Sequence, residues 1–155
     1  MRQMDLDGLL MCRIQGRIFE KSLTINCSSL FFIKKYMYGI DAKNMDDLVF
    51  LNITKSEEHI IDDMKDLSYG TIKFSNEELY WLGYMYRYIS YTYEIDSTRL
   101  FKLIPGSKLL EYYNAYSQAD PTYVINRIFT ENNIIVEDDY LFTKTQNIIT
   151  NKLNS

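Results

Sequence analysis

The side chains best suited to chemistry lie in one acidic run that contains Glu57, Glu58, His59, Asp62 and Asp63. A spacing of four residues places Glu58 with Asp62, and His59 with Asp63, on common faces of a helix. Divalent metal sites use such ligands, so a metal-dependent enzyme is one alternative. His59 is the only histidine, and the chain lacks an H-E-x-x-H motif. A solvated acidic helix face without metal is therefore the simpler interpretation.

Other catalytic signatures are missing from the sequence. It contains no P-loop, no G-x-G-x-x-G and no nucleophile elbow. Cys12 and Cys27 form no C-x-x-C pair, and we interpret both as reduced packing residues. The sequence therefore predicts a protein that is not an enzyme, uses no cofactor and acts by binding another protein.

A second alternative is a DNA-binding regulator. Residues 97–104 and 107–117, separated by Pro105 and Gly106, have about the lengths of a helix-turn-helix. The second segment, SKLLEYYNAYS, carries one Lys, one Glu and no Arg. Recognition helices need basic or amide groups, and the chain has a net charge of −4. Nucleic acid is thus not the expected partner.

The element that must position any site is the stretch 76–94, NEELYWLGYMYRYISYTYE. Ser75 and Glu78 form an S-x-x-E capping box, which predicts that a helix begins here. Nearly every face of this helix is apolar or aromatic, which is typical of a helix buried on several sides. We expect four of its side chains to be buried: Trp81, Leu82, Met85 and Ile89.

Around this helix the sequence predicts a single all-α domain over residues 1–155, with six or seven helices and at most one short strand pair. Hydrophobic residues make up 46% of the chain and only two Pro are present, which favours long helices around one core. The expected helices cover residues 4–23, 29–38, 56–67, 76–94, 97–104, 107–117 and a segment opened by Asp120 and Pro121. Residues 132–155 give a weaker pattern, with fraying expected at 152–155.

Targeting signals are also missing. The first residues lack the long apolar core of a signal peptide, and no run approaches a membrane span of about 18 apolar residues. We therefore expect a cytoplasmic protein that does not enter a membrane.

Charge and aromatic content suggest where a partner would bind. Residues 41–66 contain eight acidic and three basic residues, which would suit a basic cleft on a partner. Tyr and Arg on the central helix could act as anchors if their face is open. The candidate partner-binding residues are Glu57, Glu58, Asp62, Asp63, Tyr84, Arg87 and Tyr91.

Four segments together carry a resemblance: Phe31–Asp46, Glu78–Glu94, Ser97–Ile104 and Asp120–Phe129. They resemble a group of small bacterial helical proteins from toxin–antitoxin-type gene neighbourhoods, over roughly residues 28–130. The resemblance implies an antitoxin-like or accessory protein that binds and neutralises a partner, such as a toxin encoded nearby. It transfers no site residue.

Overall fold

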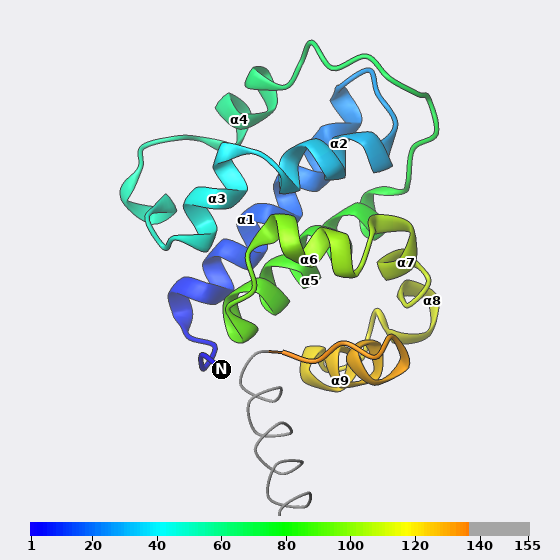
Figure 1. Ribbon diagram of the computed structural model, residues 1–155. Coiled ribbons are helices and arrows are strands. Elements are labelled where there is room, and N and C mark those ends of the chain that lie inside the picture. The colour runs from blue at the N-terminus through cyan, green and yellow to red at the C-terminus, as the bar shows by residue number, and fades with distance from the viewer. Residues whose placement is uncertain (137–155) are drawn as a thin grey trace, which may run out of the picture.

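The computed structural model describes residues 1–136, which form an all-α fold without strands, as the sequence predicts (Figure 1). Seven of the helices described have seven or more residues. The α-helices are α1 Leu6–Lys21, α2 Ser29–Met37, α3 Ile40–Asp46, α4 Glu57–Asp63, α5 Asn76–Tyr93, α6 Ser97–Leu103, α7 Gly106–Leu110, α8 Tyr113–Tyr116 and α9 Pro121–Glu131. The predicted frayed tail at 152–155 lies outside the described residues.

Local sequence explains where most of these helices begin. A Ser or Asp side chain accepts a hydrogen bond from a backbone N–H in the first turn of six helices. These caps are Asp5, Ser28, Ser56, Ser75, Asp96 and Asp120. The predicted capping box of Ser75 and Glu78 is present, and α5 ends at Glu94, whose φ of 55° is left-handed.

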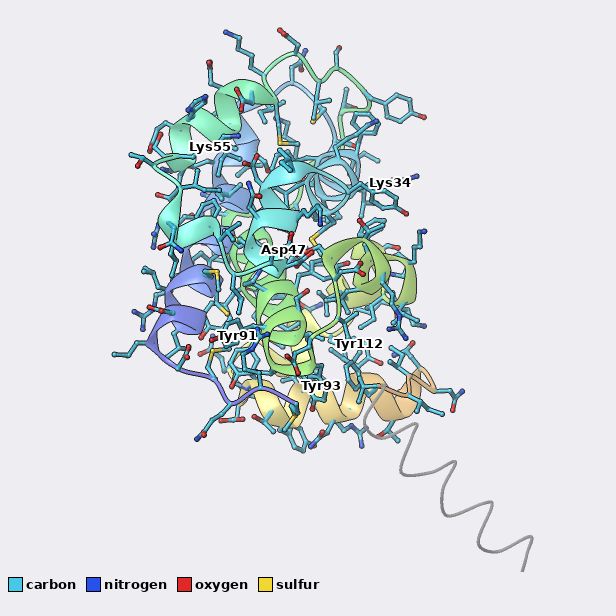
Figure 2. The ribbon with its side chains drawn as sticks, turned by 60° about the vertical axis from the view of Figure 1, so that its left-hand side comes forward. Lys34, Asp47, Lys55, Tyr91, Tyr93 and Tyr112 are labelled. Carbon is cyan, nitrogen blue, oxygen red and sulfur yellow. The ribbon has the colours of Figure 1, made fainter. Side chains whose placement is uncertain are left out.

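The centre of the fold is the antiparallel pair α1 and α5, which lie side by side in Figure 1. Arg2 at one end donates its N–H to Thr92 O, and Gly16 near the other end packs against the ring of Tyr80. The four side chains predicted to be buried in α5 are buried. α9 packs against the end of α5 through Phe129 and Tyr93, whose ring centroids are 4.8 Å apart (Figure 2).

Two expected details differ from the structure. Residues 107–117 do not form one helix, because a turn at Glu111 and Tyr112 separates α7 from α8. The Tyr112 side chain points toward α9, where its hydroxyl donates to the Glu131 carboxylate at 2.7 Å. α3 is a helix that the predicted ranges do not include; it begins directly after Gly39, and α2 ends at its C-cap Tyr38.

Candidate functional site

Arg87 lies inside the fold, so it is not an accessible anchor. Its side chain is 1% exposed and forms an ion pair with Asp46 at 2.7 Å. The guanidinium also donates to Gln15 Oε1 at 2.8 and 3.0 Å and to Ser97 Oγ at 2.9 Å. The suggested partner-binding role of Arg87 is therefore corrected: four hydrogen bonds from its guanidinium connect α5 to α1, α3 and α6.

Tyr91 is likewise turned inward, toward the N-terminal helix (Figure 2). It is 6% exposed, and its hydroxyl donates to Asp5 Oδ1 at 2.7 Å. The Arg2 guanidinium lies 4.6 Å from the ring centroid. Burial, followed by the bond to Asp5, raises the pKa of Tyr91 to about 12. Tyr91 holds the N-terminus against α5, which replaces its suggested role as an anchor.

The acidic residues at the start of α4 are paired with basic residues of α1. Glu57 accepts from Arg17 Nε at 2.6 Å and lies 3.5 Å from Lys21 Nζ. Glu58 pairs with Lys21 as well, and this hydrogen bond lowers the pKa of the Glu58 carboxyl. These pairs attach α4 to α1, so the start of the acidic run is partly neutralised within the chain.

The end of the acidic run is also paired. Lys55 bridges Asp63 at 2.9 Å and the buried Asp41 at 2.8 Å, and Asp62 lies 3.4 Å from Lys65. His59 lies 3.6 Å from Asp63. Within residues 1–136, no three His, Cys, Asp or Glu side chains are grouped so that they could hold a metal ion. The carboxylates have cationic neighbours instead of the convergent geometry that a metal requires.

The suggested helix-turn-helix segment lacks its second helix. The region 107–117 is divided between α7, with five residues, and α8, with four. A recognition helix presents several turns to the major groove, and neither fragment is long enough to do so.

Tyr84, by contrast, opens onto a hollow of about 550 Å³ beside α5. The floor comes from the N-terminal half of α5, one wall from the end of α1, and the other from α8 and the start of α9. The lining residues are Glu20, Asn76, Glu77, Tyr80, Trp81, Tyr84, Met85, Tyr113, Ser117, Gln118, Ala119 and Pro121. Trp81 contacts Tyr113 edge to face, with centroids 5.7 Å apart, so the rings are held in place.

A second hollow of about 340 Å³ follows along the same helix. Its lining includes Met4, Tyr88, Thr122 and Ile125. Tyr88 stands one turn beyond Tyr84, with ring centroids 6.2 Å apart, and Thr122 follows the Pro121 of the first hollow. The two hollows therefore adjoin each other along α5 and along the start of α9. We call them together the tyrosine groove.

The floor of the tyrosine groove is a row of three half-buried rings, Tyr80, Tyr84 and Tyr88. Their centroids are 6.1 and 6.2 Å apart, with interplanar angles of 30° and 31°. Gly16 of α1 leaves room for this row because it has no side chain: a Cβ there would lie 2.8 Å from the Tyr80 ring. The row continues through both hollows.

Polar atoms in the groove are left for a ligand. Among the described residues, the hydroxyls of Tyr80 and Tyr84 and the indole N–H of Trp81 have no hydrogen-bond partner. Within the same part of the chain, the carboxylates of Glu20 and Glu77 form no ion pair. Burial raises the pKa of the Tyr84 hydroxyl, which therefore remains a neutral donor at physiological pH. An apolar floor with free donors and acceptors at its edge is typical of a binding site.

Sequence reasoning identified Tyr84 but missed the rest of this site. The spacing of Tyr80, Tyr84 and Tyr88 by four residues was the available signal, because such residues share one helix face. Glu20 and Tyr113 carried no signal, since only the packing of α1 and α8 against α5 brings them to the groove.

Comparison with known protein families, with curated proteins and with solved structures finds no match to this chain. Within residues 1–136, no helix has the length and apolar character required to cross a membrane.

Proposed function

We propose that this protein is a non-catalytic binding module that holds a segment of a partner protein in the tyrosine groove. The observation that carries the proposal is the groove itself, with hollows of about 550 and 340 Å³ along one aromatic row. Tyr and Trp dominate the energetics of protein interfaces because they bury large areas with little loss of conformational entropy. Here Trp81 is the only tryptophan, and it lines the groove.

The proposal includes an antitoxin-like role, in which binding neutralises a partner encoded nearby. The resemblance of residues 28–130 to proteins of toxin–antitoxin-type gene neighbourhoods supports this role. A neutralising protein needs a persistent binding surface and no catalytic centre, and a groove built on the most buried helix is such a surface.

The test is co-expression with the products of adjacent genes, followed by affinity capture and a growth assay. We expect a neighbour that is toxic alone to be captured and its toxicity to be suppressed. Tyr84→Ser should reduce capture and rescue. Tyr69→Ser is the matched control, because Tyr69 is 67% exposed and packs on Phe31 of α2, away from the groove. The proposal fails if no neighbour is captured, or if the two variants behave alike.

A further inference from the structure

We infer that the occupant of the tyrosine groove is an amphipathic helix of the partner, with a Lys or Arg side chain placed between Glu20 and Glu77. This inference rests on the proposed function and adds the chemistry and shape of the bound segment. The helical shape follows from what the groove offers to a peptide backbone, and the apolar stripe follows from the rings on its floor. The Lys or Arg follows from two carboxylates that have no ion-pair partner within residues 1–136.

The shape of the occupant follows from what the groove offers to a peptide backbone. No strand exists in residues 1–136, so there is no sheet edge to which an extended segment could add. An extended peptide, such as a polyproline II segment, would gain no backbone hydrogen bonds from this surface and would have to leave its N–H and C=O groups to solvent. A helix satisfies these groups internally and lays one apolar face into a groove. The helix-in-groove mode is therefore the one that this surface favours.

The length of the groove fits several helical turns. Its lining on α5 extends from Asn76 to Tyr93, which corresponds to about 25 Å at the rise of an α-helix. Tyr80, Tyr84 and Tyr88 repeat once per turn along this line. An apolar stripe at i, i+3 or i+4, and i+7 on the bound helix would meet the gaps between these rings.

The cation follows from the charge at one end. Among residues 1–136, the first hollow is lined by Glu20 and Glu77 and by no Lys or Arg. Glu20 lies in the last turn of α1, where the carbonyl end of the helix disfavours a negative charge. Within the described chain neither carboxylate has an ion-pair partner, although most other carboxylates there are paired or cap a helix. A basic side chain from the partner would neutralise both, and Tyr80 and Tyr84 would accept its aliphatic stem.

The experiment is a display selection of single helices, about 18 residues long for five turns, randomised on one face and free of Trp and Tyr. The library is selected on the wild-type protein and depleted on the Tyr84→Ser variant. Enriched peptides are then synthesised and titrated into the protein. Fluorescence of Trp81 reports occupancy directly, because it is the only tryptophan and it lines the groove.

We expect enriched peptides to combine an apolar stripe at helical spacing with Lys or Arg near one end. Replacing that residue by Gln should weaken binding about tenfold, the size of a well-formed charge pair at an interface. The double variant Glu20→Gln and Glu77→Gln should bind both peptides equally. The same double variant should melt within a few degrees of the wild type, because neither carboxylate has an ion-pair partner in the described chain and the two helix-end effects oppose each other: Glu77 is favourable in the first turn of α5, and Glu20 is unfavourable in the last turn of α1.

Enriched peptides without helical spacing, or without a basic residue, would overturn the inference. So would a second copy of this chain in the groove, detected as a dimer that Tyr84→Ser dissociates. Failure to enrich any peptide would overturn it as well. Each of these leaves the proposed function standing if a neighbouring gene product is still captured through Tyr84. Loss of that capture alone removes the proposed function, so the two failures are distinguishable.

Discussion

Gln15 and Gly83 meet at the crossing of α1 and α5 with almost no space between the two backbones. Gln15 Nε2 donates to Gly83 O at 2.9 Å, and a Cβ on Gly83 would lie 2.6 Å from Gln15 O. The carbonyl oxygen of the Gln15 side chain simultaneously accepts from Arg87. One glutamine therefore sets both the distance between the central helices and the position of the buried guanidinium.

Gly83→Ala should destabilise the protein, although alanine is the better helix former. The added methyl would meet backbone atoms of Gln15 and Gly16 at 2.6 to 2.9 Å, so the helices must separate. Such overpacking costs about 1–3 kcal/mol. Urea denaturation measures the loss. Gly106→Ala is the control, because its Cβ would meet only side-chain atoms, of which the nearest is the end of Leu30 at 3.1 Å. Equal losses would contradict the close-approach argument.

Arg87→Met should lower the free energy of unfolding by about 3–5 kcal/mol, because it leaves the carboxylate of Asp46 without its cation. Asp46→Asn should also be costly, since it leaves the guanidinium charge buried. The double variant should lose much less than the sum of the two. Denaturant titration of the four proteins gives the coupling energy, and additivity within error would show that the pair does not interact.

The capping box of Ser75 and Glu78 shows what the sequence could predict, because its partners are three residues apart. The same holds for the buried face of α5, which the density of apolar side chains indicated. The role of Arg87 could not be predicted, since its partner Gln15 is 72 residues away and only the docking of α1 brings them together. Glu57 appeared solvated for the same reason, because its partner Arg17 lies 40 residues earlier.

Stability should fall at alkaline pH as tyrosines ionise in the unfolded chain first. The pKa of Tyr91 is raised to about 12 by burial and by the bond to Asp5, from an ordinary value of 10.0. Between these values the unfolded state has lost the proton and the native state keeps it, so stability decreases as pH rises. Tyr91→Phe should make this decrease shallower in thermal melts, and an unchanged slope would contradict it.

Glu57→Gln should cost more than Glu58→Gln, although both residues belong to the acidic run. Glu57 is 20% exposed and contacts Arg17 and Lys21, so loss of its charge should cost about 1 kcal/mol. The side chain of Glu58 is 73% exposed, and we expect no measurable change there. Thermal melts at low and high salt would check this difference. If both variants match the wild type, α4 does not depend on these pairs for its attachment to α1.

Tyr84→Ser and Tyr86→Ser should separate binding from folding, although the two tyrosines are only two positions apart in the sequence. Tyr86 is 0% exposed and donates its hydroxyl to Ile104 O at 2.6 Å, so its truncation should cost about 3–5 kcal/mol. Tyr84 is half-buried, lines the groove and has no hydroxyl partner among the described residues, so its truncation should leave the melting temperature within a few degrees of the wild type. Circular dichroism melts measure folding stability, and capture of a neighbouring gene product measures binding. Tyr84→Ser should lose capture while it remains folded. If Tyr84→Ser instead melts as early as Tyr86→Ser, its ring is part of the core and the groove is not a free surface.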